Sequence, residues 1–160
     1  MQLYNKLSAN ERAILIEKAG NRRITLSFYK YHQIKNTSIF RDHLYLMWEK
    51  LDVLGRIYIA SEGINAQLSM PSQNLNEFKT KLDSIDFLKE IRLNVAVEQD
   101  DFSFLKLKVK IRNKIVADGL SENSFDLSNN GTHVNASEFN TLIENPNTLL
   151  VDMRNHYESE

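Results

Sequence analysis

Residues 56–70 have the sequence RIYIASEGINAQLSM, and this stretch decides the fold. Its two halves, 56–60 and 64–70, are rich in β-branched and aromatic side chains, which is typical of β-strands. The tripeptide Ser-Glu-Gly at 61–63 separates the two halves. Because so short a link joins neighbouring strands, the stretch predicts a β-hairpin.

The segments on either side of the hairpin predict two helices and two more strands. Upstream, residues 24–31 predict a strand, and apolar residues at helical spacing between Asn36 and Gly55 predict a helix. Downstream, residues 71–85 predict a second helix, and residues 91–97 alternate as a strand. The order β-α-β-β-α-β predicts an α+β ferredoxin-like fold, a split antiparallel four-stranded sheet with both helices on one face.

An N-terminal extension, residues 1–23, precedes these elements. Within it Ser8 and Glu11 form a capping-box pattern, in which each side chain can bond the backbone amide of the other residue. The apolar residues that follow, and then Gly20, predict a short helix over residues 9–19 that could dock on the main domain.

The ferredoxin-like domain is expected to span residues 24–118, and its last part, residues 104–117, alternates again. That run predicts either an added strand at the sheet edge or a protruding ribbon. Residues 119–135 are rich in Gly, Ser and Asn without periodicity, which predicts a linker. Residues 136–160 would then be the onset of a second domain.

This final segment predicts one capped helix, with Phe139, Leu142 and Ile143 facing inward, and then a buried strand at 149–151. One helix and one strand cannot bury a core of their own. We therefore expect that the sequence stops inside a second, truncated domain.

Composition limits the chemistry of the chain. Its 160 residues include 20 Lys and Arg, 21 Asp and Glu, and no Cys, so thiolate, disulfide and Cys-zinc chemistry are excluded within it. The four histidines, His32, His43, His133 and His156, lack metal-ligand spacing, and no metal site is expected. No signal peptide or membrane-spanning run is apparent, so we expect a cytoplasmic protein without a membrane partner.

The strongest local signal is a basic strip in which every second residue is a cation. It consists of Lys106, Lys108, Lys110, Arg112 and Lys114. In a strand all five would share one face, over roughly 26 Å. Such a row repels itself unless it is solvated, paired or bound to a polyanion. It therefore indicates either RNA phosphates, with Phe102 or Phe104 stacking on a base, or a solvated edge balanced by nearby aspartates.

The hairpin turn is a second candidate site. Gly63 permits a positive φ, and Glu62 and Asn65 would be presented at the end of the sheet. They could contact substrate or a partner domain. A plain hairpin connection is the alternative.

Five stretches are distinctive in combination. They are SFYKY at 27–31, GRIYIASEGIN at 55–65, the run from FLKLKVK to IV at 104–116, GTH at 131–133, and LVDMRNHYE at 150–158. Together they resemble the rhodanese-related tRNA uridine hydroxylases. The sequence departs from that family's pattern at Ala66, where a Gly is usual, and at Lys114, where a Glu is typical.

The resemblance implies an acylphosphatase-like or ferredoxin-like domain followed by a rhodanese domain, whose onset would include Asp152 and Arg154. Members are similar to enzymes that use molecular oxygen to make 5-hydroxyuridine at the wobble position of tRNA, with an essential Cys in the rhodanese loop. No Cys is present in this chain, so no catalytic residue and no cofactor can be assigned to it, and it is not expected to be catalytic alone.

Two hypotheses of different class follow from this resemblance. In the first, the chain docks tRNA through the basic strip and works with a rhodanese domain of the same parent protein. In the second, it is a scaffold or protein-interaction domain of a rhodanese-type sulfurtransferase. A domain that only buttresses the rhodanese domain is a simpler variant of the second.

Overall fold

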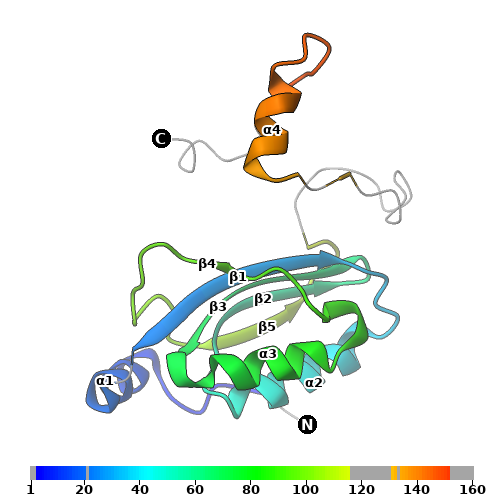
Figure 1. Ribbon diagram of the computed structural model, residues 1–160. Coiled ribbons are helices and arrows are strands. Elements are labelled where there is room, and N and C mark those ends of the chain that lie inside the picture. Colours follow the sequence, from blue (N-terminus) through cyan, green and yellow to red (C-terminus); the bar gives the residue numbers. More distant parts are fainter. Residues whose placement is uncertain (1–2, 21, 116–130, 133, 152–160) are drawn as a thin grey trace. The chain divides into compact units, whose positions relative to one another are not determined.

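The computed structural model describes residues 3–20, 22–115, 131–132 and 134–151 (Figure 1). The chain divides into two compact units, residues 1–127 and residues 128–160. Each unit is described by itself.

The first unit contains a five-stranded mixed sheet with the order β4-β1-β3-β2-β5. Its strands are β1 (Arg23–Tyr31), β2 (Leu54–Ala60), β3 (Gly63–Pro71), β4 (Asn94–Val95) and β5 (Leu107–Ile111). Strand β3 is antiparallel to both β1 and β2, so the predicted hairpin is confirmed. Strand β4 is antiparallel to β1, whereas β5 is parallel to β2 and forms the other edge.

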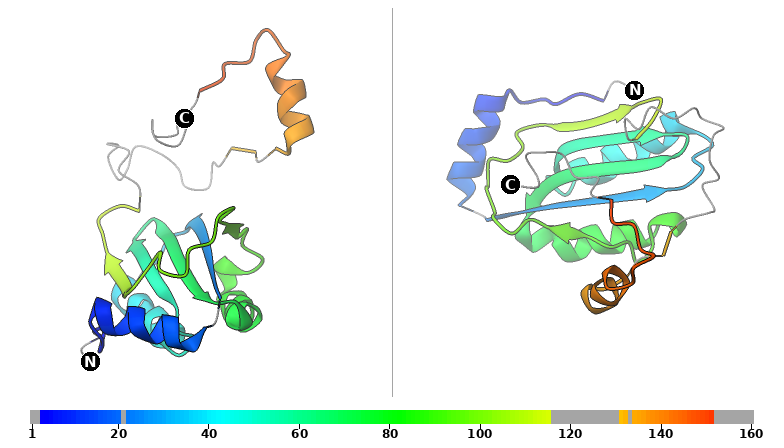
Figure 2. Two further views of the ribbon diagram at one scale, coloured as in Figure 1. Left: turned by 90° about the vertical axis from the view of Figure 1, so that its left-hand side faces the viewer. Right: turned by 90° about the horizontal axis from the view of Figure 1, so that it is seen from above.

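Helices α2 (Thr37–Glu49) and α3 (Leu75–Asp83) cover one face of this sheet (Figures 1 and 2). Helix α2 begins where Asn36 accepts a hydrogen bond from the backbone N–H of Ile39 at 3.0 Å. Short 3₁₀ turns at Ser72–Asn74 and Asp86–Leu88 flank α3. The predicted β-α-β-β-α-β order and ferredoxin-like fold class are confirmed, with β5 as an addition.

The core lies between the sheet and these two helices. Trp48 of α2 packs edge-on against Phe28 of β1, with ring centroids 6.3 Å apart, and lies 5.6 Å from Phe78 of α3. All three side chains are at most 1% exposed. Burying each contributes about 1.5–3 kcal/mol, so these contacts join the helices to the sheet.

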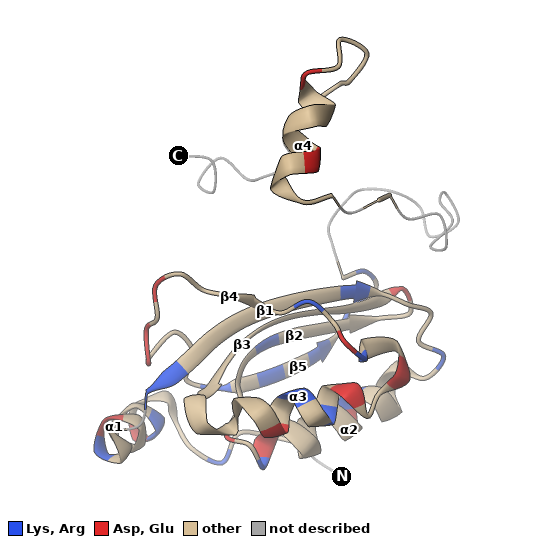
Figure 3. Ribbon diagram, in the orientation of Figure 1, with Lys and Arg blue, Asp and Glu red and all other residues tan. Residues whose placement is uncertain are grey.

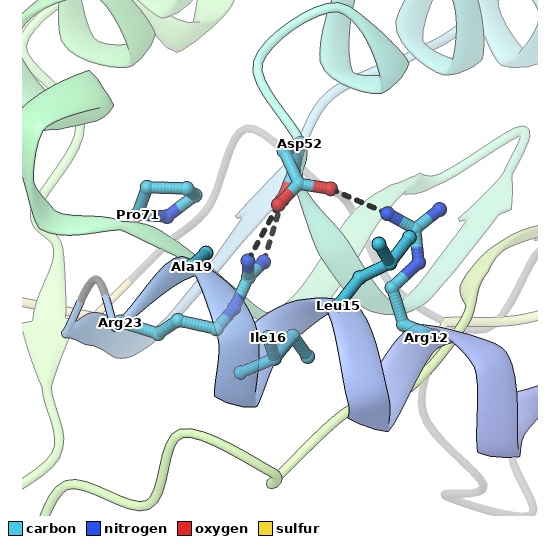
Figure 4. A pocket seen from close by; sticks show the side chains of 7 residues that line it. All are labelled: Arg12, Leu15, Ile16, Ala19, Arg23, Asp52 and Pro71. Carbon is cyan, nitrogen blue, oxygen red and sulfur yellow. Dashed lines mark hydrogen bonds and ion pairs between the residues drawn. The ribbon is translucent and has the colours of Figure 1, made fainter.

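Helix α1 (Ala9–Ala19) forms as predicted, with a capping box between Ser8 and Glu11. It is fastened to the domain through Asp52, a residue with a positive φ of 52° at the end of the loop after α2. The carboxylate of Asp52 accepts from Nη1 of Arg12 at 2.8 Å and from Nη1 of Arg23 at 2.7 Å (Figure 4). These three residues also line a cavity of about 280 Å³.

Two predicted strands are shorter in the structure. Of residues 91–97 only Asn94 and Val95 pair with β1. Beyond them the chain leaves the edge of β1: Ala96 still donates to the carbonyl of Thr25 at 2.9 Å, but Val97 is fully exposed. Of the run predicted at 104–117, the structure describes residues 104–115, and among these the strand is β5, which joins the sheet edge.

The second unit contains α4 (Ala136–Ile143), which is capped by Asn135 and Glu138 as a capping box. The prediction that its apolar residues face inward was wrong, because Phe139, Leu142 and Ile143 are 40–47% exposed. The predicted buried strand at 149–151 does not form, and these residues are 60–86% exposed. The described residues of this unit form one helix and no sheet on which such residues could be buried.

The other predictions for this region, which include Asp152, Arg154 and most of the linker, lie outside the described residues. Within the described part of the chain, no helix is long and apolar enough to cross a bilayer.

Candidate nucleic-acid interface

Strand β5 positions the centre of the basic strip. Leu107 is 3% exposed and belongs to the core, and Val109 packs partly against it. Lys106, Lys108 and Lys110 alternate with these two residues and are exposed. Figure 3 shows Lys and Arg positions in blue along β5 at the sheet edge. The alternation predicted from the sequence therefore holds from residue 106 to residue 110.

The strip extends onto the neighbouring strand. In the parallel register of β2 and β5, Arg56 lies beside Lys108 and Tyr58 beside Lys110. Neighbouring strands are about 4.8 Å apart, so the exposed Arg56 adds a fourth cation to the same surface. Sequence reasoning missed Arg56. The signal was present, because Arg56 and Tyr58 alternate with the core residues Ile57 and Ile59.

These residues belong to the open face of the sheet, which carries neither α2 nor α3 (Figure 2). The register of the strands arranges the side chains of this face in two rows, and each row crosses β1, β3, β2 and β5. One row is Tyr29, Asn65, Tyr58 and Lys110; the other is Ser27, Gln67, Arg56 and Lys108. The open face, defined by these eight residues, contains three cations and no carboxylate.

The last part of the basic strip departs from strand geometry. Pairing ends at Ile111, and the N–H of Arg112 donates to the carbonyl of Ile59 at 2.8 Å. The guanidinium of Arg112 lies over the ring of Tyr58, with 5.2 Å between its central carbon and the ring centroid. Lys114 follows in irregular backbone and is half-buried. The prediction that strand alternation would place all five cations on one face therefore fails beyond Ile111.

The hairpin turn holds the segment that follows β5. Glu62, 9% exposed, accepts a hydrogen bond from the N–H of Ile115 at 2.8 Å, and Asn65 Nδ2 donates to the Ile115 carbonyl at 3.4 Å. At Gly63 any Cβ would collide with the backbone oxygen of Lys30. These residues therefore clamp Ile115, which is 5% exposed, to the end of β2 and β3.

The two described aspartates that precede the strip bond backbone groups. Asp101 accepts from the N–H of Arg23 at 2.7 Å, and Asp100 accepts from the N–H of Phe102 at 2.9 Å. In the described ranges no carboxylate forms an ion pair with Lys106, Lys108 or Lys110. Unpaired cations grouped on one surface are suited to a polyanion.

Other chemistry finds little support in the described residues. His32 stacks on Phe87, with ring centroids 4.4 Å apart. Among residues whose placement is described, no three His, Asp or Glu side chains are grouped so that they could hold a metal ion. The described residues therefore offer a surface of exposed cations beside two tyrosines.

The split sheet, its two covering helices and the basic open face define an α+β domain of the acylphosphatase-like class. The family described as the UPF0176 acylphosphatase like domain matches residues 23–115, which is more than half of the chain, and the chain belongs to this family. The matched region begins with β1 at Arg23 and ends at the clamped Ile115.

Longer relatives give the family a biochemical context. The tRNA uridine(34) hydroxylase of Leptospira interrogans is 54% identical over 158 residues, which are 99% of this chain and 42% of that protein. The proteins of the same name from Photorhabdus laumondii and Yersinia pestis are 46% identical over 159 residues and are covered over 45% of their length. The resemblance predicted from the sequence is confirmed, and the chain spans less than half of these relatives.

Proposed function

We propose that this chain is the N-terminal, tRNA-docking part of an oxygen-dependent tRNA hydroxylase that makes 5-hydroxyuridine at the wobble position. The observation that carries the docking role is a group of exposed cations on and beside the open face that form no ion pair with the described residues: Lys106, Lys108, Lys110 and Arg56. The names of the relatives support tRNA as the polyanion and favour hydroxylation over the sulfurtransferase alternative.

In this proposal the chain binds and orients tRNA, and the reacting groups come from a rhodanese domain of the same parent protein. Asp152 and Arg154 would belong to the onset of that domain. Molecular oxygen is the cosubstrate of the parent enzyme, and a tRNA substrate places that enzyme in the cytoplasm. Glu62, Gly63 and Asn65 contribute by fixing the backbone that carries Arg112 and Lys114.

The strip would act through phosphate contacts. Each Lys or Arg that neutralises a phosphate releases a condensed counterion, which makes affinity fall as salt rises. Lys108 and Lys110 project from an edge strand whose backbone is paired with β2. Little ordering entropy is then lost when they meet the phosphates.

A matched pair of charge-reversal variants tests this role. In one, Lys106, Lys108 and Lys110 are replaced by Glu. In the other, Lys79, Lys81 and Lys89 are replaced by Glu, which gives the same net charge but alters exposed residues on and just after α3, at the helix-covered side. The readout is the affinity for labelled tRNA, measured by fluorescence anisotropy over a range of salt concentrations.

We expect the strip variant to bind tRNA at least ~10-fold more weakly. The slope of log affinity against log salt concentration should be smaller in magnitude by about 2–3. The control variant should change affinity by less than about 3-fold, because a global charge change acts through screened, long-range attraction only. Equal losses in both variants, or no loss in the strip variant, would contradict the docking role.

A further inference from the structure

We propose that the open face also receives unpaired nucleobases, so that a single-stranded RNA segment crosses the sheet with its bases on the aromatic side and its phosphates along the basic strip. This inference rests on the proposed RNA-docking function and names the kind of RNA. It is carried by the aromatic residues of the open face, which a phosphate-binding role leaves unused.

Tyr29 offers the first stacking surface. Its side chain is 53% exposed on β1, the strand between β4 and β3. Tyr31 contacts it edge to face, with ring centroids 6.4 Å apart and an interplanar angle of 78°. This contact orients the Tyr29 ring while half of its surface stays open to solvent. An oriented, exposed ring is the kind of platform on which unpaired bases stack.

Tyr58 and Arg112 offer the second surface. The guanidinium lies over the Tyr58 ring, and Arg112 is exposed. A guanidinium plane supports a base as an aromatic ring does and adds a positive charge. The backbone of Arg112 is held from both sides, by the carbonyl of Ile59 and by the clamp on Ile115. The second surface is therefore preset before RNA binds.

The two surfaces lie in one row. Tyr29 and Tyr58 flank Asn65, so about 10 Å separates their strand positions, and Lys110 lies about 5 Å further towards the edge. In the next row, the exposed amide of Gln67 lies between Ser27 and Arg56. Amide groups can donate to and accept from base edges. Polar readout groups thus lie between the stacking side and the charged side.

This order across the sheet matches a nucleotide chain better than a protein segment. Among the eight residues of the open face, the cations lie on β2 and β5, whereas β1 offers the neutral residues Ser27 and Tyr29. An apolar peptide would leave the cations unpaired, and duplex RNA would bury its bases and leave the tyrosines without contacts. A single RNA strand can place its phosphates against the cations and its unpaired bases against the tyrosines.

The test compares two RNA probes: a short labelled oligouridylate and a blunt RNA duplex of the same length. The variants, made in the full chain, are Tyr29→Leu and Tyr58→Leu. Tyr29→Phe keeps the ring, and Tyr4→Leu removes an exposed tyrosine that lies before α1, outside the sheet. The emission of the single tryptophan, Trp48, which is buried on the opposite side of the sheet, reports whether each variant is folded.

We expect each Leu variant to weaken oligouridylate binding about 5-fold or more and to change duplex binding less than about 2-fold. Tyr4→Leu should bind both probes as the unchanged chain does, and Tyr29→Phe, which keeps the ring, should bind oligouridylate more tightly than Tyr29→Leu does. The inference is overturned if the Leu variants bind oligouridylate with unchanged affinity, or if they lose affinity for both probes equally. It is also overturned if the unchanged chain binds neither probe, which would leave the face to a protein partner.

The triple Lys→Glu variant separates the two proposals. If it loses affinity for both probes while the Leu variants lose none, phosphate docking stands and base stacking fails. If it binds both probes as the unchanged chain does, phosphate docking itself fails. Photocrosslinking with a thiouridine-containing oligonucleotide gives a second readout: crosslinks at Tyr29 or Tyr58 support stacking, and crosslinks confined to the lysines contradict it.

Discussion

The two faces of the sheet differ although the same strands build both. On β1, Phe28 is 1% exposed and packs against Trp48, whereas its neighbour Tyr29 is 53% exposed. On β2, the buried Ile57 is flanked by Arg56 and Tyr58 on the opposite face. Because successive side chains of a strand point to opposite faces, one short segment can provide both core packing and a binding surface.

Substitutions on the two faces should affect two different quantities, the free energy of unfolding and the affinity for RNA. Changes on the helix-covered face should alter the free energy of unfolding and leave RNA affinity unaltered. Substitutions on the open face should lower RNA affinity and leave the free energy of unfolding unaltered. Glu62, which holds the backbone that follows β5, should affect both the free energy of unfolding and RNA affinity.

The largest effect on stability is expected for Phe28→Ala. Truncating a buried Phe removes its contact with Trp48 and leaves a cavity, which costs about 3–5 kcal/mol of unfolding free energy. Urea denaturation followed by circular dichroism measures this loss. Under conditions in which the variant stays folded, its tRNA affinity should equal that of the unchanged chain. A loss of affinity in the folded variant would break the separation between the faces.

An intermediate effect is expected for Glu62→Ala. The substitution leaves the N–H of Ile115 without its carboxylate acceptor, and an unsatisfied buried donor costs about 1–3 kcal/mol. Hydrogen exchange at the Ile115 amide should accelerate accordingly. Glu62→Gln is the matched control, because its side-chain oxygen can still accept this bond. Equal exchange rates in the two variants would show that the clamp does not depend on Glu62.

A smaller effect is expected for Lys108→Gln. One phosphate contact fewer should lower the slope of log affinity against log salt by about 0.7–0.9. The free energy of unfolding should stay within about 0.5 kcal/mol, since the side chain is exposed. Lys79→Gln on α3 is the control and should leave the slope unchanged. If both substitutions alter the slope equally, the strip has no special position in binding.

The smallest effect on stability is expected for Tyr29→Leu. The ring is half-exposed, and its described contact is with Tyr31, so unfolding free energy should change by no more than about 0.5 kcal/mol. The measurement is the same urea titration that is used for Phe28→Ala. A loss comparable to that of Phe28→Ala would mean that the open face also stabilises the fold, and would remove the contrast between neighbouring residues.

Much of the fold could be predicted because its signals are local. The hairpin follows from two alternating runs and a three-residue link, and the first helix follows from the capping box at Ser8 and Glu11. Local patterns could not show that residues 149–151 would be exposed and form no strand with the described residues. Burial of such a run depends on partners far away in the sequence.

The candidate site also has a part that the sequence predicts and a part that depends on tertiary structure. Sequence alone determined that Lys106, Lys108 and Lys110 share a face, because a strand has a period of two residues. Only the tertiary structure decided that β5 pairs in parallel with β2, which places Arg56 beside Lys108 and Arg112 over Tyr58. The physical reason is that side-chain alternation is a property of one strand, whereas register is set by hydrogen bonds and core packing between segments about 50 residues apart.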